Sequence, residues 1–282
     1  MQLIDGKLIS TQIKEEVKEK VMLLKEKDIR VGLAVIQVGD DPASSIYVRN
    51  KIKACEYTGI ESTMIKLNDN ISEDELIDWI KEFNEDEDID GILVQLPLPK
   101  HINTKNVIDT ISPEKDVDGF TRINSGSLFI GDNEFVSCTP LGVLELLKRY
   151  NIEISGKNCC VIGRSNEVGK PMALLMLQEN ATVTICHSKT TNLKEFTKNA
   201  DILILAIGKA KFINSDFIKD NAVVIDIGIN RDENNKLCGD VDFENVKDKV
   251  SFITSVPGGV GPMTIAMLMN NCVKNKFNKY IK

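Results

Sequence analysis

Strand-like and helix-like segments alternate along this chain from one end to the other, and this alternation is the strongest constraint on its fold. Residues 31–38 and 91–96 are apolar runs with strand character, while apolar side chains recur at helical spacing over residues 13–24 and 48–59. Strands that read as continuous apolar runs are typical of parallel sheets, because helices cover both faces of such sheets. We therefore expect an α/β fold built from parallel sheets.

The length of the chain favours two domains, since 282 residues exceed what one hydrophobic core usually organises. A weakly periodic stretch at residues 125–137 precedes a clear new helix, which begins at Pro140 behind a Thr139 cap. Beyond it, four apolar strands are expected at residues 158–162, 182–186, 202–207 and 223–227. We predict an N-terminal α/β catalytic domain over residues 1–121 and a C-terminal Rossmann-like, doubly wound dinucleotide-binding domain over residues 139–262.

Charge and hydropathy narrow the classes of partner. A formal net charge of −7 argues against a nucleic-acid-binding surface, because such surfaces need clustered Lys and Arg. Residues 1–10 lack the basic and apolar stretches of a secretory signal, and no run approaches the roughly 18 apolar residues of a membrane span. We expect a cytoplasmic protein that binds small molecules and neither nucleic acid nor membranes.

Cysteine and histidine usage argues against metal sites and disulfides. The seven cysteines are scattered without CxxC spacing, so neither a zinc site nor a disulfide framework is indicated. His101 and His187 are the only two histidines, which leaves little support for a histidine-rich metal site or a Ser-His-Asp triad. We expect no metal, and acid–base chemistry then falls to Lys, Asp, Glu or Tyr.

A polar turn between a strand and a helix, residues 160–171, is the candidate cofactor site. Free N–H groups at such a helix start can bind a pyrophosphate, although the Arg164-Ser165 pair replaces the tight GxGxxG turn. The next strand runs into His187-Ser188-Lys189 with no acidic residue to bind a ribose 2′-hydroxyl. Arg164, with Ser188 or Lys189, would instead hold a 2′-phosphate, which favours NADP over NAD. The alternatives are a plain strand–helix connection and a surface salt bridge for Arg164.

Candidate catalytic side chains lie in the N-terminal half. Tyr47 and Lys51 are i, i+4 neighbours beside an apolar helical spine, where partial desolvation would suit a lysine to proton transfer. Gln95 interrupts an apolar strand at the end where α/β ligand sites open, and Asp118 lies in a Gly-ended turn. The alternatives are a solvated lysine whose stem packs past an ordinary tyrosine, a strand-end amide bonded to backbone, and an aspartate that bonds local backbone.

Residues 255–264 contain three glycines and two prolines before a final helix. Glycine density of this kind permits close approach of the backbone to a ligand, and the alternative is a domain connector.

Seven motifs in order along the chain resemble those of the methylenetetrahydrofolate dehydrogenase/methenyltetrahydrofolate cyclohydrolase family, above all its bacterial bifunctional members. They are Tyr47-x-x-x-Lys51, GILVQLPLP (91–99), PEKDVDG (113–119), VIGRSNEVGKP (161–171), HSKT (187–190), DIGIN (226–230) and PGGVGPMT (257–264).

The resemblance implies roles for these residues. Lys51 would transfer protons, Gln95 would modulate it by a hydrogen bond, Tyr47 would position the substrate, and Asp118 would grip the pterin. The family's NADP-binding residues correspond to Gly163, Arg164, Ser165, Ser188 and Ile229. The loop Pro257, Gly258, Gly259, Val260, Gly261 and Pro262 would bind substrate and close over the reacting groups. The resemblance also implies that a last helix at residues 263–282 completes the first domain, that the active site lies in the cleft between domains, and that the molecule is a homodimer.

The implied activity is oxidation of 5,10-methylenetetrahydrofolate with NADP, followed by hydrolysis of the methenyl product to 10-formyltetrahydrofolate, in one-carbon metabolism. Three alternatives stay open on the residues alone. They are a dehydrogenase that lacks the hydrolase activity or prefers NAD, a folate-binding protein without turnover, and a likeness of fold only.

Overall fold

The computed structural model describes residues 1–281, apart from the side chain of Ala43, and it confirms the expected two-part α/β organisation. A larger-sheet unit contains residues 1–10 and 139–264, and a smaller-sheet unit contains residues 11–138 and those from 265 onward. The division falls inside α1 (Gly6–Lys25) and inside α10 (Val260–Tyr280). No helix within residues 1–281 is long and apolar enough to cross a membrane.

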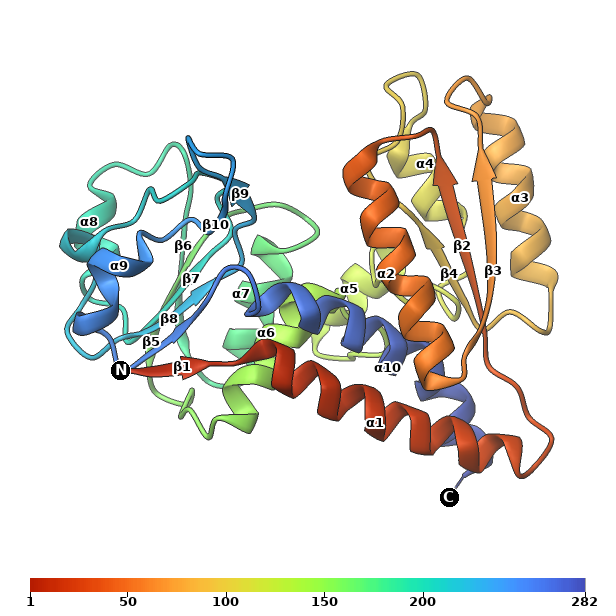
Figure 1. Cartoon of the computed structure of the whole chain (residues 1–282), viewed down its shortest axis with the longest axis horizontal. Coiled ribbons are helices and arrows are strands. Elements are labelled where there is room, and N and C mark those ends of the chain that lie inside the picture. Colours follow the sequence, from red (N-terminus) through yellow and green to blue (C-terminus); the bar gives the residue numbers. More distant parts are fainter. Residues whose placement is uncertain (282) are drawn as a thin grey trace. The chain divides into compact units, whose positions relative to one another are not determined.

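The smaller-sheet unit holds a parallel three-stranded sheet in the order β3-β2-β4. Its strands are β2 (Gly32–Val38), β3 (Glu61–Leu67) and β4 (Gly91–Val94). Helix α2 (Pro42–Thr58) connects β2 to β3, and α3 (Glu73–Glu85) connects β3 to β4. These crossovers run in opposite directions along the sheet, so α2 and α3 cover opposite faces (Figure 1).

Local sequence signals explain where these helices begin and end. The Ser72 hydroxyl accepts a hydrogen bond from the Glu75 backbone N–H, and the Glu75 carboxylate accepts one from the Ser72 N–H, which is the expected capping box. Helix α2 starts at Pro42 behind Asp41, whose carboxylate accepts a backbone N–H of the first turn. It ends at Gly59, which adopts the left-handed conformation with φ 82°.

Two shorter helices, α4 (Thr104–Thr110) and α5 (Arg122–Ile130), complete this unit. Helix α5 occupies part of the stretch that the sequence pattern assigned to the domain crossover. The pattern missed it because nine residues give too few turns to show an apolar periodicity, although the Thr121 hydroxyl caps it by accepting the Asn124 N–H.

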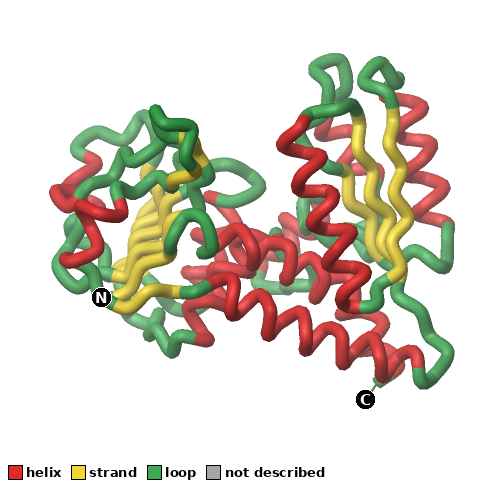
Figure 2. Tube along the Cα trace, in the orientation of Figure 1, coloured by secondary structure: helices red, strands yellow, loops and turns green. Residues whose placement is uncertain are grey.

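The larger-sheet unit is built on a parallel six-stranded sheet in the order β1-β11-β8-β7-β5-β6, drawn in yellow in Figure 2. Its strands are β1 (Gln2–Ile4), β5 (Asn158–Ile162), β6 (Thr182–Cys186), β7 (Ile202–Leu205), β8 (Val223–Asp226) and β11 (Phe252–Thr254). The four expected strands are present as β5 to β8, and the sheet is wound outward in both directions from β5 and β7. The carboxyl ends of β5, β6 and β7 therefore meet at one edge.

Shorter elements surround this sheet. They are α6 (Cys138–Arg149), α7 (Gly169–Gln178), α8 (Leu193–Thr197), α9 (Phe243–Val246), the 3₁₀ turns Ser215–Phe217 and Lys247–Lys249, and a hairpin of β9 (Asn230–Arg231) and β10 (Leu237–Cys238). Apolar side chains from β5, β7 and β8 form its core with residues of the connecting segments, including Ile213, Ile218 and Val241.

Residues 1–10 lie with the larger-sheet unit, whereas the sequence pattern placed them in the first domain. Strand β1 pairs in parallel with β11, with Leu3 opposite Ile253, so the chain begins as an edge strand of the larger sheet. Both strands span three residues, which is too short for a periodic apolar pattern to identify them in sequence. Strand β1 exists through its pairing with β11, some 250 positions away in the chain, whereas β11 pairs with β8 as well.

Candidate active site and cofactor pocket

A lysine and a glutamine from different elements meet in the smaller-sheet unit. Lys51 lies in the middle of α2 and is 8% exposed, and its Nζ donates a hydrogen bond to Gln95 Oε1 over 3.0 Å. Gln95 follows the last residue of β4, and its backbone N–H donates to Ile36 O, which continues the sheet ladder by one residue. Its Nε2 donates to Leu96 O over 2.7 Å, so both ends of the amide are held. The structure thus joins Lys51 and Gln95 by the hydrogen bond that the resemblance implied.

The turn that carries Asp118 is shaped by a different aspartate. Asp116 is buried, and its carboxylate accepts hydrogen bonds from the backbone N–H groups of Phe120 and Thr121 and from the Asn124 side chain. Asp116 therefore performs the local backbone bonding that the sequence left open for Asp118. The turn is joined to β4 because the Ile92 N–H donates to Lys115 O.

The Asp118 carboxyl has an unusual electrostatic environment. Desolvation by burial raises the pKa of Asp118 above its usual range, and the positive charge of nearby Lys51 opposes that rise. Asp118 as a whole residue is nevertheless only partly buried. A carboxylate in such a place is available to a ligand and is sensitive to what binds beside it.

Tyr47 lies one helical turn before Lys51 and is 37% exposed. Partial burial raises the pKa of its phenol, so the ring is neutral at ordinary pH. A half-exposed neutral ring can offer a flat apolar face to a planar ligand.

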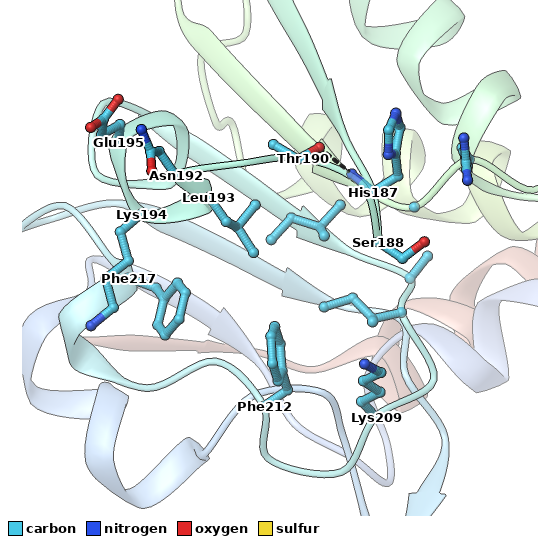
Figure 3. Close-up of a pocket in the computed structure, with 15 residues that line it drawn as sticks. His187, Ser188, Thr190, Asn192, Leu193, Lys194, Glu195, Lys209, Phe212 and Phe217 are labelled. Atoms are coloured by element: carbon cyan, nitrogen blue, oxygen red, sulfur yellow. Dashed lines mark hydrogen bonds between the residues drawn. The ribbon is translucent and has the colours of Figure 1, made fainter.

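The larger-sheet unit contains a pocket of about 710 Å³ at the carboxyl ends of β5, β6 and β7 (Figure 3). Gly163 and Arg164 line it after β5, Ser188 lines it after β6, and Ile207 lines it after β7. Among the described residues, the predicted cofactor residues Ser165 and Ile229 do not line it. Ser165 instead accepts a hydrogen bond from the Val168 N–H through its hydroxyl and so shapes the turn before α7.

Both apolar and charged side chains line this pocket. Leu193, Phe212 and Phe217 supply apolar surface, and Lys209 lies over the Phe212 ring at 5.3 Å from its centroid (Figure 3). Arg164, Lys194 and Lys209 add positive charge, and Glu195 adds one negative charge. An apolar slot with cations beside it suits a nucleotide, whose base is flat and whose phosphates are anionic.

Sequence reasoning missed Leu193, Lys209, Phe212 and Phe217 as pocket residues. The position of Lys209 was a usable signal, since it follows the end of β7 at the edge where α/β sheets bind ligands. The two phenylalanines come from a segment without periodic pattern, and only the folded chain places them together.

Glycines at the start of α7 allow the turn to pack closely. A Cβ on Gly169 would lie 2.4 Å from Gly163 C, and a Cβ on Gly163 would lie 2.7 Å from Ala206 O. Neither position therefore tolerates a side chain, which explains both glycines of the turn without reference to a ligand.

The glycine-rich loop before α10 is also tightly packed. Gly258 has φ 101°, and its carbonyl accepts a hydrogen bond from the Lys7 N–H. A Cβ on Gly259 would lie 2.5 Å from Ser255 O, and one on Gly6 would lie 1.8 Å from Gly259 O. The backbone of the loop itself requires Gly258 and Gly259, and the contact between the loop and α1 requires Gly6. Gly261 and Pro262 already belong to α10.

Two family models match the chain over nearly its whole length. The model described as Tetrahydrofolate dehydrogenase/cyclohydrolase, catalytic domain, matches residues 4–118, and the model of the NAD(P)-binding domain of the same family matches residues 137–280. The chain belongs to the tetrahydrofolate dehydrogenase/cyclohydrolase family. The predicted family, and with it the predicted class of dehydrogenase and cyclohydrolase, is confirmed.

Individual members of the family are similar to this chain over nearly their full lengths. The bifunctional protein FolD of Agathobacter rectalis is 64% identical over 272 residues, which cover 96% of this chain and 98% of that protein. The solved structure of the bifunctional FolD enzyme from Campylobacter jejuni is 52% identical with a TM-score of 0.97, and the match covers 99% of each chain. The Trypanosoma brucei dehydrogenase-cyclohydrolase, solved in complex with NADP cofactor and inhibitor, is 36% identical with a TM-score of 0.94 and covers 99% of this chain and 98% of that one.

Proposed function

We propose that Lys51, Gln95, Tyr47 and Asp118 carry out both reactions of this family on a folate. The enzyme oxidises 5,10-methylenetetrahydrofolate to 5,10-methenyltetrahydrofolate with NADP and then hydrolyses that product to 10-formyltetrahydrofolate. The observation that carries the assignment of residues is the 3.0 Å hydrogen bond between Lys51 Nζ and Gln95 Oε1, within the part of the chain that matches the family's catalytic domain.

Asp118 would hold the pterin. An ionised carboxylate can accept two parallel N–H bonds from the 2-amino-4-oxopyrimidine edge of a folate. Asp118 is only partly buried as a residue, while Asp116 meets the needs of the local backbone. The half-exposed Tyr47 ring, one turn from Lys51, would position the folate ring system.

Lys51 would relay protons during hydrolysis. Water adds to the methenyl carbon, a proton passes through the Lys51 amine, and the carbon–nitrogen bond breaks to release the formyl product. Gln95 Oε1 accepts from the amine, which fixes its direction on a buried stem. When bound, NADP accepts a hydride from the folate methylene in the preceding step.

The pocket at the edge of the larger sheet fits NADP. Its apolar side chains suit the adenine ring, and Arg164 and Ser188, which both line it, suit a 2′-phosphate. The three residues directly after β6, which are His187, Ser188 and Lys189, include no acid that would bind a ribose 2′-hydroxyl, and the nearest acid that lines the pocket is Glu195 in α8. Gly163, Ser165 and Ile229 complete the proposed set of NADP contacts, and residues 257–262 are proposed to contact the substrate.

We also propose that the enzyme is a cytoplasmic homodimer. All seven cysteines are present as free, buried thiols, which agrees with a reducing compartment. The resemblance to the family supports the dimer. Light scattering on the purified protein tests it, because a dimer has twice the 31.4 kDa mass of the chain.

The test of the activity is a spectrophotometric assay with 5,10-methylenetetrahydrofolate and either NADP or NAD. Reduced cofactor, methenyl and 10-formyl species are followed together. Reduction of NADP with 10-formyl product is expected. Reduction with accumulating methenyl product would leave a dehydrogenase alone, and no reduction with either cofactor would indicate a folate-binding protein.

A further inference from the structure

A buried aspartate outside the proposed catalytic set lies directly behind the wall of the cofactor pocket. Asp240 follows the β9–β10 hairpin and is 0% exposed. Its Oδ2 accepts hydrogen bonds from the N–H groups of Ile207 at 2.7 Å and Gly208 at 3.2 Å. Its Oδ1 accepts from the Lys209 N–H at 2.8 Å and from Asn230 Nδ2 at 2.9 Å. One carboxylate thus holds three consecutive backbone groups and one side chain.

A second buried carboxylate fixes the position of the first. Asp226 is the last residue of β8 and is 3% exposed. Its Oδ1 accepts from the Asp240 N–H at 3.0 Å and the Gly228 N–H at 2.9 Å, and its Oδ2 accepts from the Val241 N–H at 2.8 Å. Asp240 is therefore anchored to the central part of the sheet and is not free to follow the loop that it binds.

Two glycines make room for these carboxylates. A Cβ on Gly239 would lie 1.9 Å from Asp226 Oδ2, and a Cβ on Gly228 would lie 2.4 Å from Asp240 Oδ1. Neither glycine adopts a positive φ, so they are required because a side chain would not fit and not because of their backbone conformation. The DIGIN motif and the sequence Gly239-Asp240 thus form one packed arrangement.

We infer that Asp240 is a positioning residue for the cofactor, because it fixes the strip 207–209 that forms part of the pocket wall. This inference rests on the proposed function, in which the pocket binds NADP. Ile207 and Lys209 both line the pocket, and their N–H groups point away from it toward Asp240. Through Asn230 the same carboxylate also holds the residue after Ile229, a proposed cofactor contact.

The energetic reason is the cost of ordering a loop. A strip whose backbone donors are already bonded in the free enzyme loses little conformational entropy when a ligand contacts it. Hydrogen bonds to an ionised carboxylate are stronger than neutral ones, so the charge matters as well as the shape. An asparagine at this position would keep the shape but replace one acceptor oxygen with an NH₂ group that faces N–H donors.

The experiment compares NADP affinity with cyclohydrolase turnover in the full-length Asp240→Asn enzyme. We expect the Kd for NADP, measured by calorimetry, to rise about tenfold or more, because bonds to a buried charged group are lost. Cyclohydrolase turnover with methenyl substrate and no NADP should stay within about twofold of wild type, because Lys51 and Gln95 lie in the other unit. A general loss of folded protein would instead reduce NADP binding and cyclohydrolase turnover together.

The matched control is Asp201→Asn. Asp201 also accepts a backbone N–H, from Asn158 at the amino end of β5, but it lies at the opposite edge of the sheet from the pocket. Both properties of this variant should stay within about twofold of wild type, since distant sites act independently. An Asp240→Asn enzyme that binds NADP as tightly as wild type overturns the inference, while a wild type that does not bind NADP overturns the proposed function.

Asn230→Ala covers the case in which Asp240→Asn does not fold. It removes only one of the bonds to Asp240, from a partly exposed residue. We expect a rise of about three- to tenfold in the Kd for NADP with cyclohydrolase turnover retained, as the loss of one charge-assisted bond implies. A wild-type Kd in this variant counts against the inference.

Discussion

Lys51 Nζ donates to Gln95 Oε1 over 3.0 Å, and this bond links the middle of α2 to the residue that follows β4. The lysine stem is almost fully buried, so the amine is directed by one fixed acceptor. Such a geometry suits a group that must pass protons at a defined place.

Replacing Lys51 with methionine should separate the two activities. Without the amine, hydrolysis of the methenyl product should fall at least about 100-fold, while some dehydrogenation remains, because hydride transfer needs alignment more than a proton relay. The measurement is the single-step assay of each reaction. Lys53→Met, two residues along the same helix and exposed, is the control and should leave both rates unchanged. Normal cyclohydrolase activity in Lys51→Met would contradict the role given to Lys51.

Folate affinity should depend on pH through Asp118. In the proposed function Asp118 binds folate as the carboxylate, so protonation should weaken binding as pH falls. Because desolvation raises the pKa of Asp118, this loss should begin at a higher pH than for an ordinary aspartate. Asp118→Asn should bind folate roughly 10- to 100-fold more weakly and show no such acid limb, since one charged acceptor is lost. The test is a measurement of folate affinity from neutral to acidic pH. An identical pH profile in variant and wild type would show that the Asp118 carboxylate does not bind folate.

Arg164→Ala should change the preference between cofactors. Loss of a charge-assisted pair to the 2′-phosphate should raise the KM for NADP by about 10- to 100-fold, with little change in any KM for NAD. Arg30→Ala, at an exposed arginine of the other unit, serves as the control. Equal effects on both cofactors would remove Arg164 from the 2′-phosphate site.

Asp226 should make the free energy of unfolding depend on pH. Desolvation raises the pKa of Asp226 to about 6, against an ordinary 3.8, and the charge of Asp240 adds to that rise. Between these values the folded state binds the proton more tightly than the unfolded state, so this contribution to stability falls as pH rises from 3.8 to 6. The full effect is on the order of 3 kcal/mol at most.

Urea unfolding of wild type and Asp226→Asn at several pH values measures this effect. The variant does not titrate here, so the stability advantage of wild type should shrink as pH rises through the window. Asp201→Asn should show the opposite pH dependence of stability. A hydrogen bond from Lys219 lowers the pKa of Asp201, so the contribution of Asp201 to stability is lost as pH falls. A difference between wild type and Asp226→Asn that is constant with pH would refute the prediction.

Elements whose signals are local could be predicted from the amino-acid sequence. The Ser72–Glu75 capping box, the apolar runs of β2 and β5 to β8, and the motifs around Lys51 and Arg164 each lie within a few residues, so pattern and turn chemistry identify them. The α/β class and the family follow from these signals.

Features that depend on distant partners became visible only in the folded chain. It placed β1 beside β11, assigned the turn-forming role to Asp116 and not to Asp118, and put Asp240 behind residues 207–209. A three-residue strand has no stable form without its neighbour, and a buried carboxylate is tolerated only where donors from several segments converge on it. Sequence periodicity describes neighbours along the chain, whereas these interactions are set by packing between segments far apart in it.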